Sequence, residues 1–283
     1  MSHVATLAAP AMEGRRTGTP GNEKARAFVV EQFRAAGLEP LANGFELPFT
    51  FERRQTASRT TETVKIQGVN VAGLCRGTGA KDNGALVITA HYDHLGVRDA
   101  AIYHGADDNA SGVAVLLALA RHCEKSPWRH DAIFVAFDAE EMGLQGARAF
   151  VKALPIPEDR TIALNINLDM VARGDKGELY IAGTRHTPAL RPVLAPVAER
   201  AKIKVMFGHD SGGGQDDWTT QSDHGAFHEA GVPFIYFGVE DHPDYHKPSD
   251  TVDKINAAFF YQSAVTILDA VTTIDRALPL PGK

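Results

Sequence analysis

The chain has 283 residues, of which 44% are hydrophobic and 23% charged, a composition typical of a globular protein. Its formal charge of −6 is modest and its Lys and Arg residues do not cluster, so no nucleic-acid partner is expected. No stretch approaches the ~18 consecutive apolar residues of a membrane-spanning helix, so no membrane partner is expected either.

The first predicted element is an amphipathic helix from Asn22 to Ala36, which has apolar residues at helical spacing and ends before Gly37. Residues 45–72 combine β-type side chains with charges, which predicts a hairpin or edge strands. Four short apolar runs, of the kind found in strands covered on both faces, follow at Ala85–Ala90, Ala132–Phe137, Ile162–Leu168 and Pro233–Phe237.

Helical patterns accompany these runs, at Ser111–Cys123, Gln145–Leu154, Pro188–Ala201, Asp223–Ala230 and Ile255–Arg276. The alternation predicts a single α/β domain over residues 1–283, with helices on both faces of a largely parallel sheet. The Gly-rich and Asp-rich segment 208–217 is predicted to be a loop that either flanks a cleft or lies on the plain surface.

Two cysteines, Cys75 and Cys123, are too few for a disulfide framework. Each lies in an apolar context, where a small buried residue is the simpler interpretation. The sequence therefore favours free thiols over a disulfide.

Residues that can bind metals or carry protons follow the predicted strands repeatedly, as do His91, Asp93, Asp138, Glu140, Glu141 and Asp169. Ligands of open α/β sheets bind in the crevice beyond the carboxyl ends of the strands, so these side chains are expected to lie together. Histidine and carboxylate ligands without thiolates are typical of hydrolytic zinc sites.

His91 could bind a metal through one ring nitrogen while Asp93, or another carboxylate, accepts a hydrogen bond from the other nitrogen. A loop histidine beside a solvated aspartate is the competing interpretation, and the pair taken alone favours it. His94 and His104 have no evident partner in the sequence, so no role is predicted for them.

Asp108 precedes a predicted helix, and its two carboxylate oxygens could bridge two cations. The same acidic segment could cap that helix through Asp107, Asn109 or Ser111, and both interpretations can hold at once.

Glu140 and Glu141 directly follow a predicted buried strand, where two carboxylates are costly unless one binds a cation and the other faces a reacting water. An acidic helix start is the competing interpretation. Asp169 also follows an apolar strand. It could be a metal ligand, or a buried acid that accepts hydrogen bonds from backbone amides.

His246 lies between Pro243 and Pro248, which stiffen the loop and could hold a ligand in place. The loop could instead be a polar turn before the last helix, with Ser249 or Asp250 as the cap. On chemistry alone, His242 competes with His246 as a ligand.

Ordered motifs along nearly the whole chain resemble metallopeptidase family 28, the two-zinc leucyl-type aminopeptidases. The matching segments are Met12–Gly21, Ala36–Leu38, Asn70–Gly73, Ala90–Gly96, Gly105–Gly112, Phe137–Gly146, Asn167–Met170 and Tyr245–Thr251. The resemblance implies two Zn²⁺ ions, one bound by His91 and Asp169, the other by Glu141 and His246, with Asp108 bridging both. It also implies Glu140 as general base, Asp93 as the residue that orients His91, and a cis bond between Asp108 and Asn109.

By the same resemblance, the chain is a zinc-dependent aminopeptidase that acts on peptide substrates. Carboxypeptidase or dipeptidase specificity is the first alternative. Glutaminyl cyclases share the fold and use one zinc, but His91 and Asp169 beside Glu141 favour hydrolysis, and the retention of Glu140 disfavours an inactive binding ectodomain. Relatives are commonly exported, so a periplasmic or secreted protein whose leader is absent from this chain is expected, with a cytoplasmic location as the alternative.

An aminopeptidase would hold the substrate α-amine with carboxylates at the closed end of its cleft. Asp223 is a candidate for shaping that pocket, and a helix N-cap is the competing interpretation. Arg148 and Arg173 are the basic residues nearest the motifs, and both are expected to be surface charges rather than anchors for a substrate carboxylate.

Overall fold

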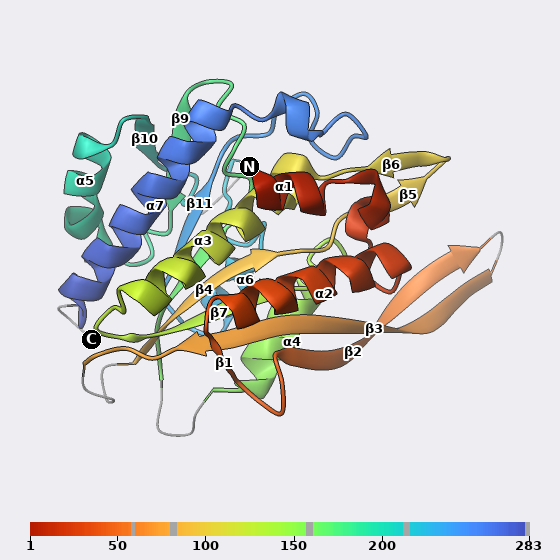
Figure 1. Cartoon of the computed structure of the whole chain (residues 1–283), viewed down its shortest axis with the longest axis horizontal. Helices are drawn as coiled ribbons and strands as arrows, with labels where there is room; N and C mark the ends of the chain where they lie inside the picture. The colour runs from red at the N-terminus through yellow and green to blue at the C-terminus, as the bar shows by residue number, and fades with distance from the viewer. Residues whose placement is uncertain (58–59, 80–83, 157–160, 212–215, 281–283) are drawn as a thin grey trace.

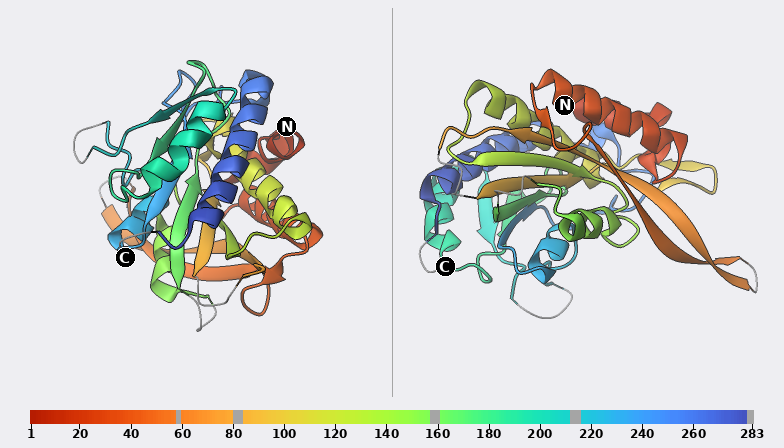
Figure 2. Two further views of the ribbon diagram at one scale, coloured as in Figure 1. Left: turned by 90° about the vertical axis from the view of Figure 1, so that its left-hand side faces the viewer. Right: turned by 90° about the horizontal axis from the view of Figure 1, so that it is seen from below.

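The computed structural model describes residues 1–57, 60–79, 84–156, 161–211 and 216–280. Within these ranges nine strands form one mixed sheet in the order β1-β3-β7-β4-β8-β11-β9-β10, with β2 paired to β3. Helices lie on both faces of this sheet (Figures 1 and 2). The predicted α/β class is therefore confirmed.

The centre of the sheet consists of four parallel strands: β4 (Ala85–His91), β7 (Asp131–Phe137), β8 (Ile162–Leu168) and β11 (Phe234–Gly238). Every residue of β4, β7 and β11 is buried. Both faces of these strands meet apolar neighbours, which is why the sequence shows continuous rather than alternating apolar runs.

The edges of the sheet differ from the predicted parallel arrangement. On one side β1 (Glu39–Pro40) and β2 (Glu46–Ala57) pair antiparallel to β3 (Thr60–Cys75), which is itself antiparallel to β7. On the other side β9 (Glu178–Ala182) is antiparallel to β11, and β10 (Lys204–Phe207) is parallel to β9. β9 and β10 were not predicted, because they are short and carry polar residues.

The β2–β3 hairpin confirms the predicted pairing and projects from the body of the molecule (Figure 1). A separate two-stranded ribbon joins β5 (Gly96–Arg98) to β6 (Ala101–Tyr103).

The longer helices agree with the predicted segments: α2 (Pro20–Ala35), α3 (Gly112–Lys125), α4 (Gln145–Ala153), α5 (Leu190–Arg200) and α7 (Ala257–Ala277). Short helices are α1 (Ser2–Leu7), α6 (His224–Glu229), η1 (Pro10–Arg15), the π-helical η3 (Ala106–Ser111) and η4 (Val252–Lys254). Residues of α1, α2, α3, α5 and α7 share the larger apolar core on one face of the sheet, and α4 and α6 contribute to a second core on the other. The helices cover both faces of the sheet, and the candidate site residues follow the carboxyl ends of its central strands.

Helix α7 is long and apolar enough, by length and composition, to meet the criterion for a membrane span, and it is the one such helix within the described ranges. Its buried side chains, among them Phe259, Ile267 and Val271, belong to the larger apolar core, and the helix packs against α5. Because a core helix passes the same test, α7 is accounted for by packing.

The prediction of free thiols is wrong, because Cys75 and Cys123 form a disulfide. Cys75 ends β3 and Cys123 lies on the buried side of α3, which packs on that part of the sheet. Their Cα atoms are 6.4 Å apart, within the range that a disulfide spans. The two cysteines are 48 residues apart in the sequence, and their apolar sequence neighbours do not indicate that they lie close together in space.

Candidate metal centre and active site

Residues from five segments meet beyond the carboxyl ends of the central strands. His91 ends β4, Glu140 and Glu141 follow β7, and Asp169 follows β8. Asp108 comes from η3, ahead of α3, and His246 from the loop after β11. The structure thus brings together the five residues that were predicted to be metal ligands: His91, Asp108, Glu141, Asp169 and His246.

The two oxygens of Asp108 face two different groups of side chains. On one side, His91 Nε2 lies 3.4 Å from Asp108 Oδ1 and 3.3 Å from Asp169 Oδ1. On the other, His246 Nε2 lies 3.1 Å from Asp108 Oδ2 and 3.4 Å from Glu141 Oε2. One carboxylate between two histidine–carboxylate groups has the form of a bridging ligand.

Cations fit these residues on two grounds. First, Asp108 Oδ2 and Glu141 Oε1 are buried and have no hydrogen-bond partner within the described ranges. Buried polar atoms are normally paired, so converging unpaired oxygens indicate a missing positive charge. Second, imidazole nitrogens with carboxylate oxygens and no thiolate are the donors of catalytic zinc sites.

Backbone and side-chain hydrogen bonds fix the η3 loop that carries Asp108. The Asp250 carboxylate accepts hydrogen bonds of 3.1 Å from the backbone N–H groups of Asp107 and Asp108. Asn109 donates to the Leu168 carbonyl at 2.9 Å, and its side-chain oxygen accepts from Gly112 N–H. The peptide bond between Asp108 and Asn109 is cis, as the resemblance implied.

Asp250 therefore has a different role from the helix cap that the sequence suggested. The last helix, α7, is capped by Asn256, whose side chain accepts a hydrogen bond from Phe259 N–H. Asp250 instead orients the loop of a candidate metal ligand 142 residues away in sequence. The local sequence pattern could not distinguish a helix cap from a residue that orients a distant loop, because in both cases an acid lies just before a helix.

Arg15 is a further residue that sequence reasoning missed. Its guanidinium is fully buried and donates to the carbonyls of Leu7, Tyr92, His104 and Gly105 at 2.7–2.9 Å. Burial lowers its pKa to about 10, although nearby carboxylates oppose the shift. Arg15 thus ties the two loops that carry the metal-site residues to the N-terminal segment. The only signal in the sequence was its place in the motif that begins at Met12.

Replacing Arg15 with Met is expected to destabilise the protein by about 3 kcal/mol, because several buried carbonyls would lose their donors. That loss corresponds to a fall in Tm on the order of 5–10 °C, measurable by thermal unfolding. The matched control is Arg16→Met, since the Arg16 side chain lines an open cleft. Equal unfolding temperatures for the two variants would contradict the role given to Arg15.

Asp93 is placed differently from its expected role. The nearest partner of His91 Nδ1 is the backbone carbonyl of Asp93, at 3.1 Å, whereas the closest carboxylate oxygen of Asp93 is 3.7 Å away. That carboxylate instead accepts hydrogen bonds from the backbone N–H groups of Glu140, at 3.1 Å, and Glu141, at 3.4 Å. Asp93 therefore positions the glutamate pair as well as His91.

Glu140 lies beside the candidate ligands, with its side chain partly accessible to solvent. Burial raises its pKa well above the usual range, and the nearby carboxylates of Asp223, Asp169 and Glu141 add to the shift while His91 opposes it. A raised pKa suits a group that takes up a proton near neutral pH.

Asp223 lies within the site, and the structure does not support its alternative role as a helix cap. It is the residue at the N-cap position of α6, but its side chain makes no capping hydrogen bond. Its carboxylate is fully buried without a hydrogen-bond partner in the described part of the chain. Burial raises its pKa well above the usual range, and Asp169 and Asp93 contribute to that shift.

The remaining basic and histidine candidates fall into two groups. Arg148 pairs with Glu229 on the surface, as expected. The expectation that Arg173 is a surface charge is wrong, because the residue is buried and its guanidinium pairs with Asp175 and Asp244. Both guanidinium groups are therefore engaged by carboxylates of their own surroundings. His242 Nε2 lies 3.3 Å from Asp107 Oδ2, apart from the five candidate ligands. His104 Nδ1 contacts the carbonyl of Ala8, and His94 lies among the candidate ligands.

His94, for which the sequence predicted no role, lies among the candidate ligands. Its Nδ1 lies 2.8 Å from Glu141 Oε1 and 3.6 Å from Asp108 Oδ2. The sequence signal was available, because His94 is only three residues after His91 and belongs to the same motif. It was missed because the loop after β4 turns both histidines inward, which local spacing does not reveal.

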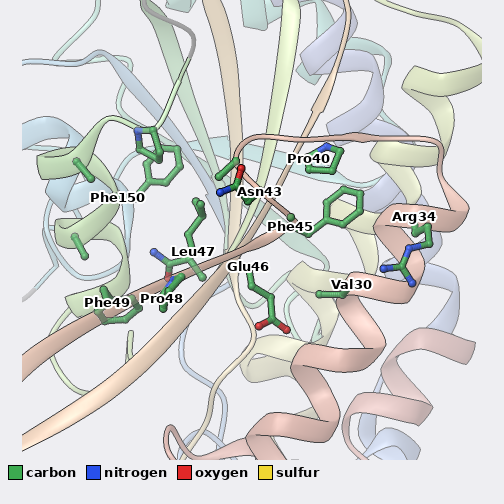
Figure 3. Close-up of a pocket in the computed structure, with 16 residues that line it drawn as sticks. Val30, Arg34, Pro40, Asn43, Phe45, Glu46, Leu47, Pro48, Phe49 and Phe150 are labelled. Atoms are coloured by element: carbon green, nitrogen blue, oxygen red, sulfur yellow. The ribbon is translucent and has the colours of Figure 1, made fainter.

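Two large hollows are lined by none of the five candidate ligands. A pocket of about 820 Å³ lies between α2, β2 and α4, lined by Val30, Leu47, Phe49 and Phe150 among others (Figure 3). A cleft of about 1220 Å³ runs from Asp138 and Met142 along the β2–β3 hairpin. Both basic and acidic side chains line it, namely Arg16, Arg26, Arg53, Arg54, Lys65, Glu23, Glu46 and Asp138. The candidate active site is placed by its converging titratable groups rather than by volume, and this cleft adjoins it at Met142.

Part of the loop predicted at 208–217, residues 212–215, lies outside the described residues. Within the described part, the Asp210 carboxylate accepts hydrogen bonds from the backbone N–H groups of Gly183 and Arg185.

Comparison with known proteins places this site in a family. The sequence model of peptidase family M28 matches residues 70–271. Aminopeptidase YwaD of Bacillus subtilis is 31% identical over 213 residues, which cover 71% of this chain and 44% of YwaD. The chain spans about half the length of the curated relatives it matches.

Two crystal structures show the same fold at low identity. BSAP, a zinc aminopeptidase from Bacillus subtilis, has a TM-score of 0.76 at 19% identity, covering 95% of this chain and 93% of that one. The glutaminyl cyclase of Fimbriiglobus ruber has a TM-score of 0.73 at 22% identity, covering 96% and 93%. A peptidase and a cyclase share this architecture, so the fold alone does not choose between them. The match of the family model over most of the sequence does show that the chain belongs to peptidase family M28.

Proposed function

We propose that the protein is an aminopeptidase that binds two zinc ions and hydrolyses the first peptide bond of peptide substrates. The observation that carries the proposal is the position of Asp108, with one oxygen toward His91 and Asp169 and the other toward His246 and Glu141. His91 and Asp169 would hold one cation, Glu141 and His246 the other, and Asp108 both.

Two cations bound there would supply Lewis acidity, which lowers the pKa of a water molecule and polarises a carbonyl group. Glu140 would accept the proton of that water and pass it to the leaving amine. Asp93 would hold the Glu140 and Glu141 backbone through its hydrogen bonds, so that one acid faces the metals and the next faces the substrate. The buried carboxylate of Asp223 would favour a positively charged α-amine nearby.

Glutaminyl cyclisation is the second candidate, because a cyclase has the same fold. The pairing of His91 with Asp169 on the far side of Asp108 favours two cations and hydrolysis over it. We also propose that the protein is exported to the periplasm or secreted. The disulfide between Cys75 and Cys123 supports this location, since disulfides persist in oxidising compartments.

The test of the proposed activity combines metal analysis with a panel of aminoacyl chromogenic amides. We expect about two zinc ions per chain and hydrolysis of the free-amine substrates but not of their N-blocked counterparts. An N-terminal glutaminyl peptide provides the control for cyclisation. Release of ammonia from that peptide, without hydrolysis of the amides, would establish the cyclase instead.

Removal of the metals is expected to abolish activity and leave the fold intact. A core of this size does not need a metal to fold, unlike a small zinc domain. Chelation followed by circular dichroism and an activity assay measures both properties, and added Zn²⁺ should restore turnover. Loss of secondary structure together with activity would contradict this expectation.

A further inference from the structure

We propose that His94 is an additional ligand of the cation on the Glu141 side, so that the two metal positions are chemically unequal. The proposal rests on the proposed function, because it assumes one cation on each side of Asp108. It concerns a histidine outside the five residues assigned above.

The position of His94 points its Nδ1 into the group formed by Asp108, Glu141 and His246. Nδ1 lies 2.8 Å from Glu141 Oε1 and 3.6 Å from Asp108 Oδ2. Ligand atoms of His94, Asp108 and Glu141 all lie within 4.8 Å of one another. The His246 ring lies beside the His94 ring, with centroids 5.9 Å apart. His246 Nε2 contacts the same two carboxylates, at 3.1 Å from Asp108 Oδ2 and 3.4 Å from Glu141 Oε2, so His94 and His246 are neighbours on the Glu141 side.

The contact between His94 and Glu141 is short but is not aligned as a hydrogen bond. Neither His94 Nδ1 nor Glu141 Oε1 has a hydrogen-bond partner within the described ranges, although the two atoms are 2.8 Å apart. Hydrogen bonds weaken steeply as the donor angle closes, so this pair satisfies neither atom. A cation that lies off the line between the two atoms would satisfy both lone pairs.

Packing holds the His94 ring in this orientation. The side chain is only 1% exposed, and its ring lies against Gly105. A Cβ atom at Gly105 would lie 2.6 Å from Cγ and Cδ2 of the ring, and φ of Gly105 is +57°. Glycine is therefore needed there both for backbone conformation and for the space that the ring occupies.

The proposal gives the two metal positions different numbers of protein donors. The Glu141 side would have His94, His246, Asp108 and Glu141, whereas the other side would have His91, Asp108 and Asp169. Four protein donors close a tetrahedral zinc site, while three leave a position open for water or substrate. We therefore assign tighter metal retention to the Glu141 side and the open coordination position to the His91 side.

Cobalt substitution tests the assignment without depending on turnover. Histidines bound to Co²⁺ give strongly shifted, exchangeable imidazole N–H signals in proton NMR, one for each ligand. The protein loaded with two cobalt ions is expected to show three such signals, from His91, His94 and His246. His94→Phe, which keeps a ring but removes the donors, should lose one signal and weaken the binding of one cobalt ion. His104→Gln is the matched control and should keep all three.

The possible outcomes separate the two proposals. Two signals from a protein that retains two cobalt ions would overturn the His94 assignment and leave the proposed function intact. If His94 only supported Glu141 without binding the metal, its loss would still weaken metal binding by the ~10–100-fold typical of such residues. His94→Phe would then keep the wild-type number of signals, and that result would also overturn the assignment. Retention of a single cobalt ion would overturn the two-cation proposal; two histidine signals from that ion, one of them lost in His94→Phe, would still support the His94 ligand, whereas one signal would overturn it as well. Because the count in the unmodified protein is itself decisive, the test does not depend on the variant folding.

Discussion

Replacing Glu140 with Gln is expected to leave metal content near two ions per chain while lowering kcat by roughly 10²–10⁴-fold, the usual effect of losing a general base. The substitution preserves the shape of the side chain but removes the carboxylate that accepts the proton. Metal content is measured by elemental analysis, and kcat on the best chromogenic amide. Circular dichroism verifies that the variant is folded.

The neighbouring residue provides the matched control. Glu141→Ala should lower metal occupancy, because Glu141 Oε2 lies 3.4 Å from His246 Nε2 and its other oxygen, Oε1, lies 2.8 Å from His94 Nδ1. The structure gives the pair different surroundings, since the pKa of Glu140 is raised well above its usual range by burial whereas the pKa of Glu141 is lowered despite burial, through its histidine neighbours. If the Glu140 variant lost metal and the Glu141 variant kept it, the two roles would be exchanged.

Acetylating the N-terminus of a peptide substrate is expected to abolish its cleavage, whereas amidating its C-terminus should leave cleavage unchanged. The site is rich in carboxylates, including Asp223, whose buried side chain has no hydrogen-bond partner among the described residues. Such surroundings favour a free amine and disfavour a substrate carboxylate. Mass spectrometry of three matched peptides, one free, one acetylated and one amidated, measures the effect.

The opposite result would have a structural explanation. The cleft along the β2–β3 hairpin carries Arg16, Arg53 and Arg54 and begins beside the active site at Met142. Guanidinium groups bind carboxylates well, so this cleft is where a carboxypeptidase of the same fold would anchor the C-terminus. Cleavage of the acetylated peptide, with none of the amidated one, would exclude the aminopeptidase and leave a metallopeptidase that attacks from the other end.

The sequence alone determined the centre of the fold and most of the site. The strands β4, β7 and β8 are dense in apolar residues, as expected for a sheet covered on both faces, and the chemical groups follow directly after them. Because parallel strands end at one edge, strand positions alone implied that His91, Glu141 and Asp169 would lie together.

Tertiary structure decided the features that depend on contacts between distant segments. The disulfide between Cys75 and Cys123 requires β3 and α3 to pack together, and no local pattern reports that distance. From its residue type, Arg15 would be taken for a surface charge. In the structure its guanidinium is buried among backbone carbonyls from three segments. His94 lacked a partner in the sequence, because Glu141 comes from another strand end. Periodicity and residue type report what a segment buries, whereas the partners that satisfy a buried charge or lone pair are set only when the chain folds.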